Sequence, residues 1–295
     1  MERRKRALLI YNPTAGRETA KSFLQIIMTE LEAGGFELDA HATEGPGDAM
    51  HKAASAAGEY ETVIAVGGDG TLHEIVNGLH SAPGEGHLGI IPRGTSNDFA
   101  RALGLPMDVR AACKVIIGGR AQRVDLGKIN DRFFINIAGG GSLTNISYEV
   151  PSKLKTYLGQ LAYYARSLEE LPRLKAMRMR FQAPGLDMED DIMLFLTANS
   201  RAVGGFNYLA PNASLADGKL DVVIIRSLNL AEFIQLAAKG FTGDHINHPK
   251  VTYFQTTSLH VSGEEKIPLN ADGEYAGVSP CSITVQPRSL KICVP

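Results

Sequence analysis

The sequence has few cysteines, little net charge and no long apolar run. The three cysteines are scattered and form no C-x-x-C pair, which is typical of reduced thiols in a cytoplasmic protein. The 295 residues carry a formal net charge of −2, so bulk charge does not favour nucleic-acid binding. No apolar run reaches about 18 residues, and no transmembrane helix is therefore expected.

The start of the chain is basic, as in a secretory signal, but the apolar stretch after it is short. Arg3 to Arg6 are followed by Ala7 to Tyr11 and then by Asn12-Pro13. Five apolar residues are too few for the hydrophobic region of a signal peptide. We therefore predict that residues 7–11 form the first strand of a cytoplasmic protein.

A glycine-rich loop, Gly67 to Thr71, lies between a predicted strand and a predicted helix. Residues 62–66 are apolar and largely β-branched, and apolar residues from Leu72 to Leu79 recur at helical spacing. The loop fits neither the G-x-G-x-x-G of dinucleotide sites nor the G-K-[ST] of a P-loop. Glycines at such a turn expose backbone N–H groups that can bind phosphate, although many βα turns contain glycine and bind nothing.

Strands and helices alternate through the first 120 residues or so. Strands are predicted at 7–11, 36–42, 62–66 and 88–91, and helices at 19–33, 48–57, 72–80, 99–103 and 107–117. This alternation is typical of a parallel, doubly wound sheet, in which ligands bind beyond the carboxyl ends of the strands. Polar loops follow the four strands, at 12–17, 43–47, 67–71 and 92–98. The sequence therefore predicts a ligand site where these loops meet.

Short apolar runs separated by turn residues replace this pattern near residue 120. Strands are predicted at 122–129, 132–138, 176–182, 191–198, 220–226, 251–261, 267–270 and 282–286, helices at 152–171 and 230–240, and a hairpin loop at 184–191. The spacing predicts an antiparallel β domain. We therefore divide the chain into an α/β domain, residues 1–122, and a β-rich domain, residues 123–295, whose C-terminal tail is expected to return to the first domain.

Five segments resemble motifs of the diacylglycerol kinase catalytic domain family. They are Ile10–Gly16, Val66–Leu72, Gly89–Arg101, Asp217–Asp221 and Asn270–Glu274, and they occur in the family's order over nearly the whole chain. Gly-Gly-Asp-Gly alone also occurs in NAD kinases and phosphofructokinases, but its combination with Gly-Thr-Ser-Asn-Asp-Phe is specific. The similarity to soluble bacterial diacylglycerol kinases implies a doubly wound α/β domain, a C-terminal antiparallel β-sandwich-like domain, and phosphorylation of a lipid hydroxyl by ATP with Mg²⁺.

The resemblance also implies a set of site residues. The ATP contacts fall on Asn12, Pro13, Thr14, Ala15, Gly16, Thr43, Gly67, Gly68, Asp69, Gly70, Thr71, Leu72, His73 and Thr95. His73 departs from the family pattern, because many relatives have Asn there. The catalytic base falls on Glu274, with Asp272 beside it and Asp69 in the nucleotide loop. A structural Mg²⁺ falls on the Asp217 carboxylate with backbone oxygens near Ser214 and Lys219.

Each of these acidic residues also has an ordinary structural interpretation. Asp69 would repel the phosphates of a simple cradle, so it predicts a contact with a metal, a water or the reacting group, or else a helix N-cap. Asp217-Gly218 and Asp272-Gly273 are common turn dipeptides. His245 and His248 have a spacing found in metal sites, but only Asp244 accompanies them, and we expect no metal there.

Two basic stretches are candidates for transient contact with an anionic membrane. One is Arg3 to Arg6, and the other contains Lys153, Lys155, Arg166, Arg173, Lys175, Arg178 and Arg180. Residues 176–181 alternate so that a strand would have one apolar and one basic face, and the alternative is an ordinary solvated face. We expect a cytoplasmic protein that is peripheral to the inner face of the membrane, and exposed sheet edges would allow a homodimer.

Diacylglycerol is the expected acceptor, giving phosphatidic acid. No motif selects it over phosphatidylglycerol, undecaprenol, ceramide or a sphingoid base. An NAD kinase is an alternative, but its expected Thr-Gly-Ser-Thr-like second motif is absent. A nucleotide-binding regulatory protein without catalysis is a further alternative, and the presence of both Asp69 and Glu274 argues against it.

Overall fold

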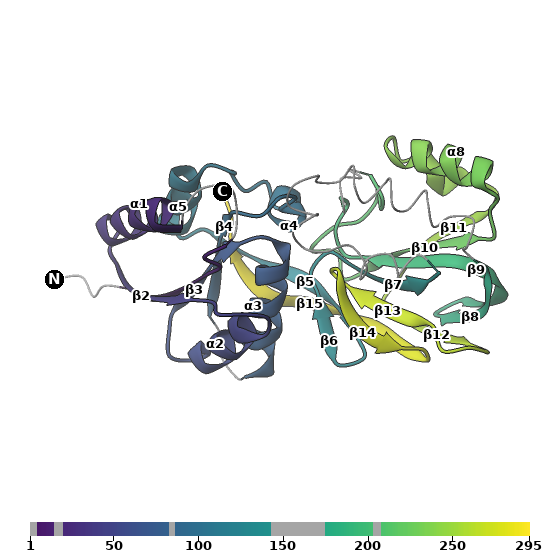
Figure 1. The fold of residues 1–295 in the computed structure, drawn as a ribbon, viewed down its shortest axis with the longest axis horizontal. Helices are drawn as coiled ribbons and strands as arrows, with labels where there is room; N and C mark the ends of the chain where they lie inside the picture. Colours follow the sequence, from purple (N-terminus) through teal and green to yellow (C-terminus); the bar gives the residue numbers. More distant parts are fainter. Residues whose placement is uncertain (1–4, 15–19, 83–85, 143–174, 203–207) are drawn as a thin grey trace. The chain divides into compact units, whose positions relative to one another are not determined.

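The computed structural model describes residues 5–14, 20–82, 86–142, 175–202 and 208–295 (Figure 1). Contacts within the chain divide it into two compact units. The first contains the residues up to Val124 together with Arg288–Pro295, and the second contains Asp125–Pro287. The helix predicted at 152–171 lies outside the described residues.

The first unit is a parallel sheet with helices on both faces. Its strands are β1 (Lys5–Tyr11), β2 (Phe36–Ala42), β3 (Thr62–Gly67) and β4 (His87–Pro92), in the order β2-β1-β3-β4. Helices α1 (Ala20–Ala33) and α5 (Val109–Gly118) cover one face, and α2 (Asp48–Ala56) and α3 (Asp69–Ser81) cover the other (Figure 1). The predicted doubly wound fold is confirmed.

Apolar strands and amphipathic helices build the core of this unit. Ile64 of β3 and Ile91 of β4 are fully buried, as is Ile27 of α1. Cys113 of α5 lies in the same cluster as a free thiol, and burial raises its pKa to about 11. The thiol is therefore protonated and unreactive at neutral pH.

The C-terminal segment also belongs to the first unit. Ile292, near the end of β15 (Cys281–Cys293), pairs in parallel with Leu88 of β4. The Nε2 atom of His80, in the last turn of α3, lies 3.1 Å from the carbonyl oxygen of Ser289. These contacts hold the end of the chain beside β4.

The second unit is an antiparallel β structure. Its described elements are β5 (Ala121–Ile129) from Asp125 onward, β6 (Arg132–Phe134), β7 (Ile137–Gly141), β8 (Met177–Ala183), β9 (Leu186–Ala198), β10 (Leu220–Arg226), α8 (Leu230–Gly240), the 3-10 helix η2 (Asp244–Asn247), β11 (Val251–Thr256), β12 (Ser258–Gly263), β13 (Pro268–Ala271), β14 (Glu274–Val278) and the first part of β15. Strand β9 pairs antiparallel with β7, β8 and β10. Phe181 and Phe195 meet edge to face in the core of the second unit, with ring centroids 5.5 Å apart. The predicted antiparallel β domain is confirmed.

One predicted strand, 132–138, is in fact two strands separated by a short break. Strand β6 ends at Phe134 and β7 begins at Ile137. The N–H groups of residues 135–137 donate to the carboxylate of Asp272 instead of to a neighbouring strand. Strand β7 then continues through Gly139–Gly141, where a Cβ atom at Gly139 would lie 2.3 Å from the carbonyl oxygen of Phe195. The glycines are therefore required by close strand packing.

The predicted hairpin loop at 184–191 is wrong, because β9 already begins at Leu186. The turn is limited to Pro184-Gly185, and the acidic residues after it lie opposite the arginines of β8. The guanidinium of Arg180 donates to Asp187, and that of Arg178 donates to Glu189 at 2.9 Å. The basic face predicted for 176–181 is thus neutralised by β9, which favours the alternative of a solvated face.

The predicted strand 251–261 is also two strands, and one strand was missed. The hydroxyl of Thr256 donates to the carbonyl oxygen of Ser258 at 2.8 Å, so the chain bends between β11 and β12. Strand β14 has no long apolar run, because its residues are Glu-Tyr-Ala-Gly-Val.

Among the described residues, no helix is both long enough and apolar enough to cross a membrane.

Candidate active site

The polar loops of the first unit meet at the carboxyl edge of its sheet. The N–H of Asn12 donates to the carbonyl of Val66, and the N–H of Thr43 donates to that of Tyr11, at 3.1 and 2.9 Å. The N–H of Arg93 donates to the carbonyl of Gly67 at 2.8 Å. The loops after β1, β2, β3 and β4 are therefore neighbours, as the strand pattern predicted.

Helix α3 begins at this edge without a side-chain cap. Its N-cap is Gly68, which has no side chain to bind the first turn, and the first backbone bond runs from Leu72 N–H to the Gly68 carbonyl at 3.1 Å. The N–H groups at the start of a helix have no partner within the helix, and the helix dipole places partial positive charge there. This is the arrangement that binds anionic oxygens.

The glycines of this loop are needed for different reasons. A Cβ atom at Gly68 would lie 2.9 Å from the Cα atom of Gly94, and one at Gly67 would lie 2.7 Å from the hydroxyl of Thr71. Packing within the protein therefore excludes larger residues at both positions. A Cβ atom at Gly70 would meet nothing within 4 Å, and its φ is not in the left-handed region. The fold itself gives no reason for glycine at position 70.

Asp69 connects the glycine loop to the next loop along the sheet edge. Its carboxylate accepts from the N–H groups of Asp98 and Phe99, at 3.1 and 3.2 Å, at the start of α4 (Asp98–Ala102). It does not cap α3 as the structural interpretation proposed, because Gly68 holds that position. A charged acceptor at the N-terminus of α4 instead fixes two ligand loops to each other.

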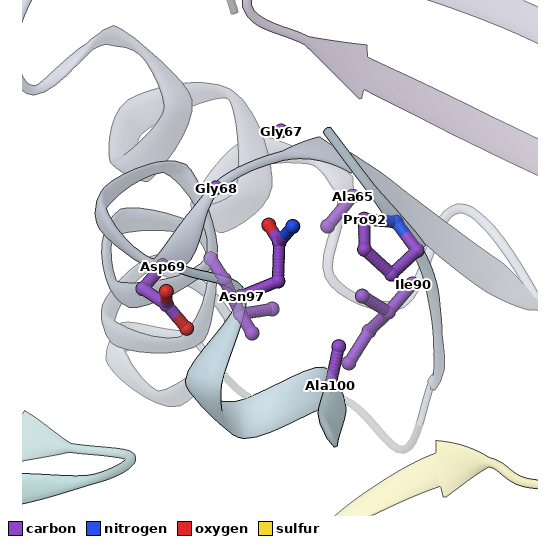
Figure 2. Close-up of a pocket in the computed structure, with 9 residues that line it drawn as sticks. Ala65, Gly67, Gly68, Asp69, Ile90, Pro92, Asn97 and Ala100 are labelled. Atoms are coloured by element: carbon purple, nitrogen blue, oxygen red, sulfur yellow. The ribbon is translucent and has the colours of Figure 1, made fainter. Parts of the chain in front are cut away.

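A small pocket lies between these loops (Figure 2). It is lined by Ala65, Gly67, Gly68, Asp69, Leu72, Ile90, Pro92, Asn97 and Ala100. Asn97 was not among the predicted contacts, although it is part of the Gly-Thr-Ser-Asn-Asp-Phe motif. Its φ is 51°, its amide accepts from Gly94 N–H at 2.8 Å, and it donates to the Gly94 carbonyl at 2.9 Å. Asparagine tolerates this left-handed conformation better than most residues.

The other predicted nucleotide contacts occupy varied positions. Asn12 accepts from both the N–H and the hydroxyl of Thr14, at 2.9 and 2.8 Å, and so shapes the first loop. Pro13 and Thr95 are exposed, Thr43 is half-buried, and Ala15 and Gly16 lie outside the described residues. His73 is only 4% exposed and its Nε2 lies 3.4 Å from the Asn77 amide. Its imidazole packs within the unit.

The predicted catalytic acids lie on a tight hairpin in the second unit. Asp272 and Gly273 connect β13 to β14, both with positive φ, and Ala271 pairs with Glu274 across the turn. The Asp272 carboxylate accepts from the N–H groups of residues 135, 136 and 137 at 2.7 to 3.0 Å. Glu274 is exposed at the start of β14. The ordinary turn interpretation therefore holds for Asp272-Gly273, and the turn presents Glu274 to solvent.

Replacing Asp272 by Asn should destabilise this hairpin. An amide nitrogen would face the N–H of Ile135, which now donates to Asp272 at 2.7 Å. Loss of a hydrogen bond to a charged group costs about 1.5–3 kcal/mol, so we expect urea unfolding at a lower midpoint. Asp131→Asn, at an exposed turn position, should unfold like the wild type. An unchanged midpoint for Asp272→Asn would show that the three contacts contribute little.

The predicted metal residues lie on a separate turn. The Asp217 carboxylate accepts from Lys219 N–H at 3.0 Å, and Gly218 N–H donates to the buried Asp125 carboxylate at 2.7 Å. Asp217, Ser214 and Lys219 are exposed. The described residues contain no group of three or more His, Cys, Asp or Glu that could hold a metal. A site built from one carboxylate and backbone oxygens stays a prediction.

The two histidines with metal-like spacing contact the backbone instead. The Nε2 atom of His245 lies 2.9 Å from the Leu209 carbonyl oxygen. The Nδ1 atom of His248 accepts from Lys250 N–H at 3.2 Å. Burial lowers the pKa of His245, so its imidazole is neutral at pH 7.

Comparison with known proteins gives matches over nearly the whole chain. Residues 6–129 match the diacylglycerol kinase catalytic domain, and residues 145–294 match the YegS C-terminal NAD kinase beta sandwich-like domain. A diacylglycerol kinase of Bacillus subtilis (strain 168) is 46% identical over 293 residues, which are 99% of this chain and 97% of the relative. This chain belongs to the diacylglycerol kinase family.

Further members of the diacylglycerol kinase family agree. The diacylglycerol kinase of Staphylococcus carnosus (strain TM300) is 43% identical over 99% of this chain and 96% of its own length. The crystal structure of a diacylglycerol kinase from Bacillus anthracis str. Sterne matches with a TM-score of 0.85 and 29% identity, over 99% of this chain and 97% of that one. The predicted family, fold and enzyme class, a lipid kinase, are confirmed.

Proposed function

We propose that this protein transfers the γ-phosphate of ATP to the free hydroxyl of diacylglycerol, forming phosphatidic acid and ADP. The hydroxyl oxygen bonds to the γ-phosphorus, the bond from that phosphorus to the bridging oxygen of ADP breaks, and Glu274 accepts the hydroxyl proton. Phosphoryl transfer needs positioning and charge neutralisation more than covalent chemistry. The relatives named diacylglycerol kinase, at 43–46% identity over 99% of the chain, support the substrate assignment.

The observation that most supports nucleotide binding is the presence of glycine at position 70. Glycine in a helix is less favourable than alanine by up to about 1 kcal/mol, yet, apart from the adjacent residues and the backbone of α3 itself, nothing lies within 4 Å of a Cβ at position 70. A ligand that comes close to the backbone explains the glycine. The uncapped start of α3 supports binding of ATP phosphates by its first N–H groups.

We assign the contact with catalytic Mg²⁺ to Asp69. Its carboxylate holds the N–H groups of Asp98 and Phe99, and a carboxylate has about four acceptor positions. This structural contact is therefore compatible with an ion or its water as a further partner. When bound, Mg²⁺ neutralises charge on the phosphates. We assign a structural Mg²⁺ to the Asp217 carboxylate and to the backbone oxygens of Ser214 and Lys219, ligands of the type that this ion prefers.

We propose that the kinase acts from the cytoplasm at the inner face of the membrane, because diacylglycerol resides in the bilayer. Of the predicted basic residues, Arg178 and Arg180 are paired with carboxylates, and Arg6 pairs with Asp39. Lys153, Lys155, Arg166 and Arg173 lie outside the described residues. If the fraction of protein that floats with liposomes is the same with and without anionic lipid, the proposed contact with an anionic membrane is contradicted. A homodimer stays a prediction.

Replacing Gly70 by Ala should weaken ATP binding without weakening the fold. A methyl group would occupy the space that we assign to the phosphates, and loss of one hydrogen bond to a charged group corresponds to about 10-fold or more in KM for ATP. Gly118→Ala is the matched control, because its Cβ atom also meets nothing within 4 Å and it lies at the end of α5. Both variants should unfold at wild-type or higher urea concentration. An unchanged KM for Gly70→Ala would remove the support for the phosphate site.

The direct test of the proposed function is transfer of labelled γ-phosphate from ATP to lipids in mixed micelles. The panel contains diacylglycerol, phosphatidylglycerol, undecaprenol, ceramide and a sphingoid base. Labelling of diacylglycerol in preference to the others is the expected result. Preferential labelling of another lipid would keep the reaction and change the substrate. Bound ATP with no labelled lipid would overturn the proposal in favour of a regulatory protein.

A further inference from the structure

A buried asparagine contacts the segment that holds Asp272. Asn199 follows β9, is fully buried, and donates through Nδ2 to the carbonyl oxygens of Asp125 and Ile135, both at 2.9 Å. Both partners are carbonyl oxygens, which only accept. The amide nitrogen must therefore face them, and the orientation of the side chain is fixed.

Asn199 and Asp272 bind opposite sides of the same two peptide groups. In the peptide that joins residues 135 and 136, the C=O accepts from the Asn199 side chain and the N–H donates to Asp272 at 2.9 Å. In the next peptide, the C=O of residue 136 accepts from Asn199 N–H at 2.8 Å, and the N–H of residue 137 donates to Asp272 at 3.0 Å. The two peptide groups are held between Asn199 and Asp272, and such chains of hydrogen bonds strengthen one another.

The second contact of the Asn199 amide reaches the turn that contains Asp217. Asp125, whose carbonyl accepts from Asn199, binds Gly218 N–H through its carboxylate at 2.7 Å. The N–H of Asp125 donates to the Leu215 carbonyl at 2.7 Å. One side chain thus connects the turn assigned to Mg²⁺ with the hairpin that carries Glu274.

Position 199 carries a side-chain amide although, among the described residues, the amide oxygen has no hydrogen-bond partner. The Oδ1 atom of Asn199 is buried and has no hydrogen-bond partner among the described residues. Burial of an unpaired acceptor is unfavourable. An amide is therefore expected here only if its two donated hydrogen bonds are needed.

We propose that Asn199 is a positioning residue for Glu274. It orients the peptide groups that bind Asp272, and Asp272 sets the turn from which Glu274 extends. This inference rests on the proposed function, in which Glu274 is the base. A displacement of a catalytic group by about 1 Å can lower the rate by 10²-fold, so a defect here acts on kcat.

The test compares Asn199→Ala with Asn229→Ala. Asn229 is the N-cap of α8 and accepts from Glu232 N–H at 2.9 Å, so its replacement also removes an asparagine contact in the same unit. With labelled ATP and diacylglycerol in mixed micelles, Asn199→Ala should lower kcat at least about 10-fold with KM for ATP within about twofold of wild type. Asn229→Ala should keep the wild-type kcat. A wild-type kcat in folded Asn199→Ala would overturn the proposal.

Two further measurements separate positioning from general damage. The double variant Asn199→Ala, Asp272→Asn should lose less than the product of the single losses, because both act through the same peptide groups. Hydrogen exchange at residues 135–137 should become at least about 10-fold faster in Asn199→Ala and stay unchanged in Asn229→Ala. Multiplicative losses or unchanged exchange would contradict the proposal. If Asn199→Ala fails to fold, Asn199→Ser, which keeps one donor, replaces it with the same expected directions.

Exchange also distinguishes this inference from the proposed function. If the wild type labels no lipid, the proposed function fails, and with it the positioning of a base. If hydrogen exchange at residues 135–137 is still faster in Asn199→Ala, only the structural part of the inference remains, namely that Asn199 orders the peptide groups that bind Asp272. If the wild type labels lipid and Asn199→Ala does so at the same kcat, the proposed function stands and the inference fails.

Discussion

Replacing Glu274 by Gln is expected to lower the rate of phosphate transfer by about 10²- to 10⁴-fold, the usual contribution of a general base. Glutamine has nearly the same shape but cannot accept the hydroxyl proton. Glu274 is exposed, so the substitution removes no buried contact and the variant should fold. ATP binding, measured by calorimetry, should stay within about twofold of wild type, because a base contributes to the chemical step rather than to uniform binding.

The control for this variant is Glu264→Gln, another exposed carboxylate in the same unit. It should transfer phosphate at the wild-type rate, which excludes a general effect of the charge change. A Glu274→Gln protein that keeps wild-type kcat would remove Glu274 as the base. In that event Asp272 would not replace it without further change, because its carboxylate is already bound by three backbone N–H groups.

Replacing Gly94 by Ala is expected to disrupt the first unit at its ligand edge. The new Cβ atom would lie 2.4 Å from the Cα atom of Gly68 and 2.8 Å from the Asn97 amide oxygen. Backbone lies on one side of this contact, so a simple rotamer change cannot relieve it. Overpacking of this kind costs about 1–3 kcal/mol, and the loops at Gly68 and Gly94 must separate.

The measurements for Gly94→Ala are urea unfolding and calorimetric ATP binding. Both the unfolding midpoint and the affinity should fall, the latter by more than about 10-fold, since the start of α3 moves with Gly68. Gly86→Ala is the control, because its Cβ atom would have no neighbour closer than 3.7 Å, near the amino end of β4. Normal ATP affinity in Gly94→Ala would mean that the contact between the loops is not needed for the site.

The sequence was most informative in the first unit, where apolar strands are each followed by a polar loop. Strands β1, β3 and β4 are apolar and end in polar loops, so the parallel sheet and its shared ligand edge could be predicted, although the order of the strands was not. The partners of Asp69 could not, because its carboxylate binds N–H groups 29 and 30 residues further along the chain. Local propensity contains no information on such a contact.

The second unit was harder to predict because long-range contacts override local signals there. The chain breaks between β6 and β7 because the N–H groups of residues 135–137 bind Asp272, more than 130 residues away. The segment at 184–191 resembles a loop in composition, but its residues from Leu186 onward form β9 opposite the arginines of β8. Asn199 had no motif to mark it, since its role depends on which carbonyl groups the fold brings to it.

The assignment of Arg288–Pro295 to the first unit has a consequence for how the protein is made. On a ribosome the chain emerges from its N-terminus, so β4 is synthesised long before Ile292, its partner through Leu88. The edge of β4 therefore remains without this partner until Ile292 has been synthesised and has emerged. By then the residues of the second unit have already emerged and can fold, since domains generally fold as units during translation. The part of the protein that is translated first is thus the part that is completed last.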